Sequence, residues 1–274
     1  MDFTEAQLQR YARHIILPEI GGIGQAKLRQ ARVLVVGAGG LGAPLLQYLG
    51  AAGIGTLGVI DHDTVSLSNL QRQVIHRTAD LGVRKVDSAR RALLEINPDC
   101  EVVSIAERLT ADNAMALVES YDIVADGSDN FATRYLLTDA CFLARRTLVA
   151  AAILRFEAQL STWKAYLGAP HPCYRCLFPE PPPPDAVPSC AAAGVLGAMA
   201  GTIGAWQATE VVKEILGVGE SLSGTLLLYD ALGASVERLE IQKRDDCPLC
   251  GARPAITSLD APLARASYDE VYCG

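Results

Sequence analysis

The chain has 274 residues, of which 50% are hydrophobic and 20% charged, and its formal net charge is −7. This is an ordinary globular composition, with enough residues for one large α/β domain or two small ones. The negative balance argues against non-specific binding to nucleic acid, which requires a basic surface.

The first residues, MDFTEAQLQR, are polar and lack the apolar stretch of a secretory signal, so we expect a cytoplasmic protein. Thr4 and Gln7 fit a capping box that opens a helix reaching about Ile16. Arg10 and Arg13 lie three residues apart and therefore share one face of this helix. On spacing alone, they indicate a solvated basic face.

A glycine-rich stretch, VLVVGAGGLG, runs from a short apolar strand into a helical pattern. Gly37, Gly39 and Gly42 fit G-x-G-x-x-G, which is typical of a βαβ nucleotide site. Glycines let the backbone approach a phosphate, and the free N–H groups of a helix N-terminus favour the anion. Asp61 follows the next strand, about twenty residues on, where an acid can accept hydrogen bonds from ribose hydroxyls.

Strands and helices then alternate, with strands expected at 33–36, 56–60, 101–105, 122–125 and 147–152 and helices at 41–52, 80–96, 111–119 and 131–144. This order predicts an α/β fold with a Rossmann-like, doubly wound sheet that binds its ligand beyond the carboxyl ends of the strands. Alternating residues at 155–165 predict antiparallel strands, so the sheet is expected to be mixed. We expect a nucleotide half at about 30–152 and an antiparallel, zinc-binding half at about 153–252.

A polar loop of unusual length, 61–73, follows the second strand, and long loops in compact α/β domains are commonly functional. Asn69 and Arg72 are placed to reach ribose and phosphate, and Arg72 offers a planar fork of donors. Lys85 opens the next helix, where the helix dipole disfavours a cation. Either an anion holds Lys85 there or it is a surface lysine.

Asp126 and Asp129 follow the apolar strand YDIVA. Two carboxylates beside a phosphate site suit Mg²⁺, which proteins usually hold through one or two carboxylates together with phosphate oxygens. Asp129 or Asn130 can instead cap the following helix, and one residue can do both.

Two C-x-x-C pairs, Cys173 with Cys176 and Cys247 with Cys250, have the spacing of a tetrahedral four-thiolate zinc site. Such a site is closed and therefore structural. It would tie together the two ends of the C-terminal half.

The other cysteines divide into buried and exposed candidates. Cys100 and Cys141 lie in strand and helix patterns and are expected to be buried. Cys190 follows a proline-rich run and precedes a helical stretch, so it is either a thiol nucleophile or sulfur acceptor, or an inert cysteine. The uncharged stretch Ala191–Thr209 is rich in Ala and Gly, which favours a helix buried in protein over a membrane span.

Together, the motifs RYARHI, GAGGLG, DHDTVSLSNLQRQ, Lys85, DGSDN and the two C-x-x-C pairs resemble the adenylyltransferase family of MoeB, ThiF and HesA. These proteins are related to the ubiquitin-activating enzymes and activate ubiquitin-like sulfur-carrier proteins. The resemblance covers about residues 5–252, so we expect one adenylation domain over 1–252, with 253–274 as a tail of unknown role.

The resemblance implies ATP as the nucleotide, with Gly40 near the phosphates and Asp61 on the ribose. Further nucleotide contacts are implied at Ser68, Asn69, Leu70, Gln71, Arg72, Lys85, Asp129 and Asn130, with Mg²⁺ on Asp129. Catalytic roles are implied for Arg72, Lys85 and Asp129, and for Arg13, which would reach into the site of a partner subunit in a homodimer. Cys190 matches a loop cysteine that forms a covalent link to the carrier in some members.

The implied reaction adenylates the C-terminal Gly-Gly of a carrier, releases pyrophosphate and prepares sulfur transfer from a separate sulfurtransferase or cysteine desulfurase. The stretches DTVSLSNLQRQ, KVDSARRALLEINP and AAILRFEAQ favour the MoeB branch, which serves molybdopterin synthesis on a MoaD-like carrier, over a ThiS-like carrier in thiamine synthesis. Two other readings stay open: a non-catalytic scaffold that binds a ubiquitin-like partner, and an NAD-dependent oxidoreductase.

Overall fold

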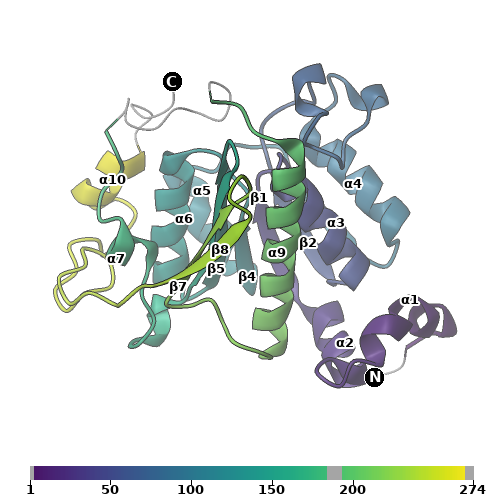
Figure 1. The fold of residues 1–274 in the computed structure, drawn as a ribbon, viewed down its shortest axis with the longest axis horizontal. Coiled ribbons are helices and arrows are strands. Elements are labelled where there is room, and N and C mark those ends of the chain that lie inside the picture. The colour runs from purple at the N-terminus through teal and green to yellow at the C-terminus, as the bar shows by residue number, and fades with distance from the viewer. Residues whose placement is uncertain (1–2, 184–192, 269–274) are drawn as a thin grey trace.

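The computed structural model describes residues 3–183 and 193–268 (Figure 1). In this part of the chain the strands are β1 Arg32–Val36, β2 Thr56–Ile60, β3 Glu101–Ile105, β4 Ile123–Asp126, β5 Thr147–Leu154, β6 Glu157–Trp163, β7 Thr225–Asp230 and β8 Ser235–Glu240. They form one eight-stranded sheet in the order β3-β2-β1-β4-β5-β6-β7-β8. Strands β1 to β5 are mutually parallel, whereas β6, β7 and β8 continue the sheet antiparallel. The expected mixed, doubly wound sheet is confirmed.

The helices of the described residues cover both faces of the sheet. They are α1 Glu5–Ile15, α2 Gly21–Gln30, α3 Gly42–Ala52, α4 Lys85–Ile96, α5 Ala111–Glu119, α6 Phe131–Leu143, α7 Tyr174–Leu177, α9 Gly197–Leu216 and α10 Pro262–Tyr268. Helix α9 packs on α3 and on strands β4 to β6, and α3 also packs on α4. Helices α5 and α6 pack together on the opposite face, where α10 joins α6 (Figure 1).

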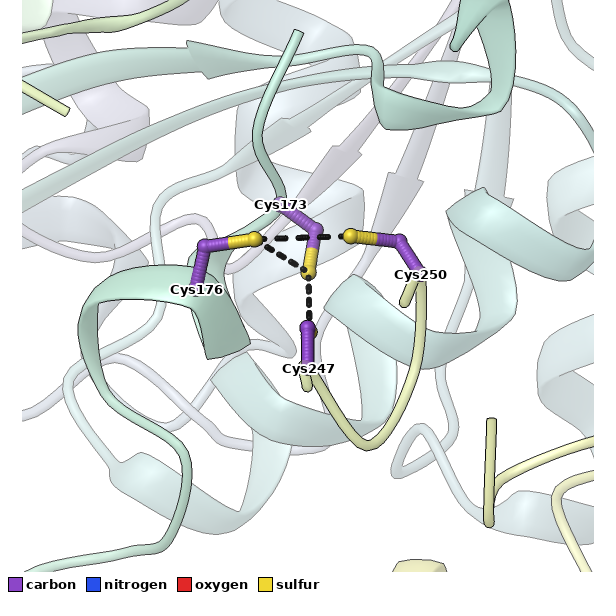
Figure 2. A group of neighbouring side chains, drawn as sticks. All are labelled: Cys173, Cys176, Cys247 and Cys250. Carbon is purple, nitrogen blue, oxygen red and sulfur yellow. Dashed lines mark hydrogen bonds between the residues drawn. The ribbon is translucent and has the colours of Figure 1, made fainter. Parts of the chain in front are cut away.

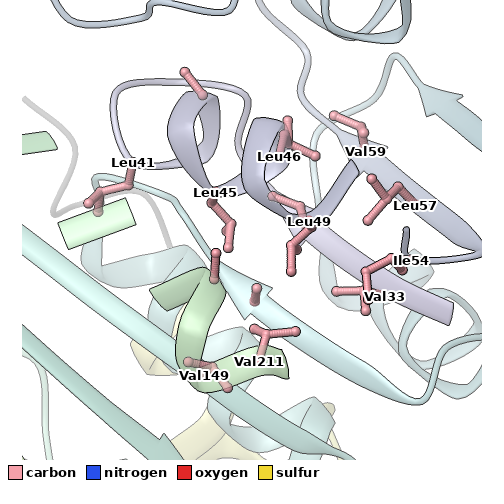
Figure 3. Packing of buried hydrophobic residues seen from close by; sticks show 14 of the residues in the cluster. Val33, Leu41, Leu45, Leu46, Leu49, Ile54, Leu57, Val59, Val149 and Val211 are labelled. Carbon is pink, nitrogen blue, oxygen red and sulfur yellow. The ribbon is translucent and has the colours of Figure 1, made fainter. Parts of the chain in front are cut away.

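Alternate residues of each strand feed two separate hydrophobic cores, because successive side chains of a strand point to opposite faces of the sheet. In β1, Val33 and Val35 join the core beneath α3, α4 and α9 (Figure 3). Leu34 and Val36 join the core beneath α5 and α6. The strand is therefore buried on both faces, which explains its unbroken apolar sequence.

The glycines of α9 allow its backbone to lie against neighbouring elements. A Cβ on Gly204 would lie 2.4 Å from Pro44 Cγ, and one on Gly197 would lie 2.2 Å from the Gln71 carbonyl oxygen. Gly201, in contrast, faces open space. Among the described helices, none combines the length and apolar character needed to cross a membrane.

The sequence reasoning placed some element boundaries wrongly. The helix expected from residue 80 begins at Lys85, because Gly82 has a φ of +80°, which no right-handed helix contains. The strand expected from 155 begins at Glu157, because Arg155 turns the chain with a φ of +55° between β5 and β6. Strands β7 and β8 and helix α10 were not anticipated.

Candidate nucleotide site and cysteine cluster

The turns after β1 and β4 lie side by side at the point where the strand order reverses. A Cβ on Gly37, which has a φ of +92°, would lie 2.9 Å from the Gly127 carbonyl oxygen. A Cβ on Gly42 would lie 1.8 Å from the Gly37 carbonyl oxygen. Neither position has room for a side chain. The glycine pattern thus builds a compact turn at the carboxyl edge of the sheet, where α/β proteins of this kind bind ligands.

Asp61, at the end of β2, is bound to this turn. One carboxylate oxygen accepts a hydrogen bond from the Ala38 N–H at 2.8 Å, and the other accepts one from the Asp63 N–H at 2.9 Å. The carboxylate therefore has a defined orientation beside the turn. Its expected contact with a ribose stays a prediction.

The long polar loop returns to the same turn. Its residues Leu67–Asn69 form a 3₁₀ turn in which the Asn69 side chain accepts a hydrogen bond from the Ser66 N–H at 3.2 Å. Arg72 donates to the Ser68 carbonyl oxygen at 3.0 Å, and its Cδ lies 3.5 Å from where a Cβ on Gly40 would be. The fold thus brings the guanidinium stem of Arg72 against the glycine turn. Leu70 and Gln71 are the next residues of this loop, and Gln71 contacts the start of α9.

Lys85 is buried, so the surface-lysine alternative is wrong. Its side chain is 7% exposed, and Nζ lies 2.7 Å from Asp63 Oδ2 and 4.0 Å from Asp61 Oδ2. Burial raises the pKa of Asp63, but the hydrogen bond and charge of Lys85 outweigh it, so the pKa lies below its ordinary value. The anion that holds Lys85 at its helix start is a carboxylate of the chain itself. A nucleotide phosphate would have to share this lysine with Asp63.

Asp126 and Asp129 have different surroundings. Asp126 is fully buried, accepts a hydrogen bond from the Ser128 N–H at 2.9 Å and pairs with Arg134 at 3.2 Å. It is therefore not open to Mg²⁺, and the pair of carboxylates considered from sequence is reduced to one. Asp129 is exposed, and its carboxylate has no hydrogen bond or ion pair within the described part of the chain.

Asn130 is the N-cap of α6, as considered from the sequence. Its side-chain oxygen accepts a hydrogen bond from the Thr133 N–H at 2.8 Å. Because Asn130 is held in this way, the start of α6 and the preceding Asp129 have a defined position after β4.

Arg13 lies away from the glycine turn of its own chain. Helix α1 packs at the other end of α3 and α4, where Asn97 donates to the Tyr11 hydroxyl and to the Gly50 carbonyl oxygen at 2.9 and 2.8 Å. The glycine turn precedes α3, whose 11 residues span about 16 Å. Arg13 is exposed, and its side chain has no hydrogen-bonding or ion-pairing partner among residues 3–183 and 193–268. The fold therefore does not bring Arg13 to the glycine turn of its own chain.

Sequence reasoning missed two buried residues beside the turn. Gln73 is 3% exposed, its Nε2 lies 3.7 Å from where a Cβ on Gly39 would be, and its Oε1 has no partner among the described residues. His76 is 5% exposed and hydrogen-bonded to the Ala38 carbonyl oxygen at 2.9 Å. A lone histidine after the apolar pair Val74–Ile75 was the available signal.

The four cysteines of the two C-x-x-C pairs come together in the C-terminal half (Figure 2). All are buried, and the sulfur distances are 3.9 Å for Cys173–Cys176, 3.5 Å for Cys173–Cys247 and 3.4 Å for Cys176–Cys250. Disulfide sulfurs lie about 2.05 Å apart, whereas tetrahedral zinc with bonds of about 2.3 Å needs sulfurs about 3.8 Å apart. The set therefore fits zinc.

The four thiols of the cluster affect one another's pKa values in opposite directions. Hydrogen bonding with Cys173 lowers the pKa of Cys176 and of Cys247, whereas hydrogen bonding with Cys176 and Cys247 raises the pKa of Cys173. The ammonium group of Lys243 donates a hydrogen bond to the Cys250 carbonyl oxygen. Cys100 and Cys141 are buried as expected, and burial raises the pKa of Cys100 to about 11. Cys190 lies outside the described residues.

Fold and site together define a Rossmann-like protein with a candidate nucleotide site and a separate four-cysteine cluster. The model of the ThiF family matches residues 11–249, and the chain belongs to this family. The resemblance to MoeB, ThiF and HesA is thereby confirmed.

Two relatives and one solved structure illustrate the family. The chain is 47% identical to the sulfur carrier protein adenylyltransferase of Thermus thermophilus, over 100% of this chain and 99% of that protein. It is 52% identical to adenylyltransferase and sulfurtransferase MOCS3 of Bos taurus, over 93% of this chain but only 56% of that protein. The chain therefore spans little more than half the length of its MOCS3 relatives. The crystal structure of Escherichia coli MccB with MccA-N7isoASN shares the fold, with a TM-score of 0.78 and 22% identity over 88% of this chain and 74% of that one. The expected enzyme class, an adenylyltransferase, is confirmed.

Proposed function

We propose that this protein uses ATP and Mg²⁺ to adenylate the C-terminal glycine of a ubiquitin-like sulfur-carrier protein. The observation that carries the proposal is the convergence of Arg72, Lys85 and Asp61 on one glycine turn. The glycine turn supplies backbone donors for an anion, and the two cations supply positive charge beside it. The relative from Thermus thermophilus, a sulfur carrier protein adenylyltransferase, supports the choice of substrate.

In this reaction the C-terminal carboxylate of the carrier attacks the α-phosphate, and pyrophosphate leaves. Arg72 and Lys85 stabilise the charge that gathers on the phosphoryl group, which is the main demand of phosphoryl-type transfer. No strong general base is required, because the attacking carboxylate is already ionised. The exposed carboxylate of Asp129 would hold Mg²⁺, because proteins usually bind this ion through one or two carboxylates together with phosphate oxygens.

The remaining assignments follow the same proposal. Arg13 acts in the site of a partner subunit, so the protein works as a homodimer. Zinc on the four cysteines has a structural role, and Cys190 is a candidate for a covalent link to the carrier. The stretches DTVSLSNLQRQ, KVDSARRALLEINP and AAILRFEAQ favour the MoeB-type branch, so the proposal includes a MoaD-like carrier in molybdopterin synthesis and a separate sulfur donor in the cytoplasm. A ThiS-like carrier in thiamine synthesis is the alternative.

The proposed adenylation domain spans 1–252, and helix α10 in the stretch that follows it packs on α6 of this domain. An oxidoreductase would have no use for Arg72, Lys85 and Asp129 together, and a scaffold would have no need of them. These residues therefore favour catalysis over both rivals.

Carrier-dependent exchange between ATP and pyrophosphate tests the proposal. We expect exchange with a carrier ending in Gly-Gly from the same organism and its loss in Asp129→Ala. The carrier that supports exchange distinguishes the molybdopterin branch from the thiamine branch. If ATP and carrier both bind but no carrier supports exchange, the scaffold reading replaces the enzymatic one.

A further inference from the structure

The Ala38–Gly39 peptide, in the middle of the glycine turn, is held by a buried histidine. His76 lies three residues after the polar loop 61–73 and is 5% exposed, with Nε2 2.9 Å from the Ala38 carbonyl oxygen. Its Nδ1 lies 2.9 Å from Ser88 Oγ, on α4. Ser88 Oγ in turn donates to Asp80 at 2.7 Å. The turn is thereby connected through two side chains to the buried carboxylate of Asp80.

The hydrogen bond to Ala38 determines where the imidazole carries its proton. A carbonyl oxygen only accepts hydrogen bonds, so Nε2 of His76 must be the donor. Burial lowers the pKa of His76, against the opposing influence of the Ala38 carbonyl, and Nε2 carries the proton that Ala38 accepts. The charged groups that act on the ring are Lys85, Asp61 and Asp80.

The same peptide bond carries a free donor on its other side. Because the peptide unit is planar and trans, the N–H of Gly39 points opposite to the carbonyl of Ala38, and therefore away from His76. This N–H donates no hydrogen bond to any residue within the described part of the chain. Gly39 is partly exposed, and the N–H of Ala38 is already bound to Asp61. Asp61 thus holds the peptide before Ala38 and His76 holds the peptide after it. The N–H of Gly39 is the donor of these two peptides that remains unused.

We propose that His76 is a positioning residue that aims the Gly39 N–H at a phosphate of the bound nucleotide. The inference rests on the proposed function, since it assumes that ATP occupies the turn. His76 makes no contact with the nucleotide itself. It holds the carbonyl of Ala38, and the rigid peptide plane transmits this orientation to the donor on the opposite side.

Two conservative variants separate positioning from mere packing. In His76→Gln, the side-chain Nε2 replaces the ring Nε2 and can still donate to Ala38. In His76→Asn, the amide reaches only as far as Nδ1, so the contact with Ser88 is retained and the one with Ala38 is lost. His171→Asn is the matched control, because His171 also contacts a serine, Ser223, at 2.9 Å and lies in the C-terminal half.

Calorimetric titration with Mg·ATP and with adenosine, together with a thermal melt of each variant, gives the test. We expect His76→Asn to weaken Mg·ATP binding about tenfold, the size of one hydrogen bond to a charged group. Adenosine has no phosphate, so its affinity should change less than about twofold. His76→Gln should restore Mg·ATP binding to within about threefold of the wild type.

Equal losses in His76→Gln and His76→Asn would overturn the positioning role, as would equal losses for Mg·ATP and adenosine. Wild-type protein that fails to bind Mg·ATP would instead refute the proposed function, and the positioning role with it. Binding by the wild type with no change in His76→Asn would remove only the positioning role.

Discussion

Arg175 and Asp139 form a bidentate ion pair, and neither side chain is exposed to solvent. Nε and Nη2 of Arg175 lie 2.7 Å from Oδ1 and Oδ2 of Asp139, and both side chains are 0% exposed. Arg175 lies between Cys173 and Cys176, and Asp139 is on α6. The pair therefore connects the cysteine cluster to α6, the helix that Asn130 caps beside the candidate nucleotide site.

Removing one partner of this pair should destabilise the protein strongly. Arg175→Met would leave Asp139 buried without a counter-charge, and we expect a loss of about 3–5 kcal/mol in the free energy of unfolding. The double variant Arg175→Met/Asp139→Leu should recover most of that loss. Urea unfolding of the three proteins gives the measurement. Arg244→Met, which breaks an exposed pair, is the control and should cost less than about 1 kcal/mol.

The cysteine cluster should hold one zinc ion per chain and contribute to folding. We expect Cys247→Ser, or a strong chelator, to remove the metal and lower the melting temperature, because the ion ties together segments far apart in the sequence. Elemental analysis and thermal melts are the measurements. Cys100→Ala, at a buried cysteine outside the cluster, should keep its zinc. A purified wild type that contains no metal and melts unchanged with chelator would contradict this prediction.

Two glycine-to-alanine changes should differ in their effects: one should weaken ATP binding, and the other should be tolerated. A Cβ on Gly42 would collide with the Gly37 carbonyl oxygen at 1.8 Å, so Gly42→Ala must displace the turn and weaken ATP binding by at least about tenfold. Gly201 lies in α9 with nothing within 4 Å of its Cβ position, so Gly201→Ala should be neutral or stabilising by up to about 1 kcal/mol. Nucleotide titrations and urea unfolding compare the two. Normal ATP affinity in Gly42→Ala would place the nucleotide elsewhere.

Asp80 should make stability depend on pH in the acid range. Burial raises its pKa, but hydrogen bonds from Ser88 and the Arg77 N–H and the charge of Arg91 outweigh this, so the pKa lies below its ordinary value. A carboxyl group with a depressed folded pKa stabilises the protein above the unfolded value of about 3.9, and this contribution is lost as the pH falls through the folded pKa.

Asp80→Asn should therefore unfold at lower urea than the wild type at pH 7, by about 1–3 kcal/mol in free energy, with a smaller difference at pH 3. Glu220→Gln, at a carboxylate that is 89% exposed, should show no such pattern. A difference between Asp80→Asn and wild type that is independent of pH would show that the charge of Asp80 is not responsible.

Mixing two inactive variants should test whether Arg13 acts across a dimer. Arg13→Ala and Asp129→Ala should each lose exchange activity. If Arg13 completes the partner's site, a mixed dimer contains one intact site, and random mixing should restore about a quarter of wild-type activity. Recovery is measured after co-refolding or co-expression. If the mixture stays inactive although mixed dimers form, Arg13 acts within its own chain.

The sequence alone was enough for the parallel strands of the sheet, the glycine turn and the cysteine set, but not for strands β7 and β8. The predicted features depend on local rules: unbroken apolar strands, glycines where a side chain would collide, and C-x-x-C spacing. Such rules are weaker at the ends of elements. The helix expected from residue 80 begins at Lys85, because a single glycine with positive φ separates it from the preceding turn.

Only the tertiary structure decided what each polar residue contacts. Asp126 and Asp129 looked equivalent in the sequence, yet Arg134 neutralises the first inside the core, and the second remains exposed. Lys85 looked like a surface lysine or a phosphate ligand, and its partner turned out to be Asp63, 22 positions earlier in the chain. Hydrogen bonds and ion pairs between side chains depend on which distant segments of the chain meet. The pattern of apolar and polar residues along one segment does not contain that information. The role of His76 arises for the same reason, because Ala38, 38 residues away, is its partner.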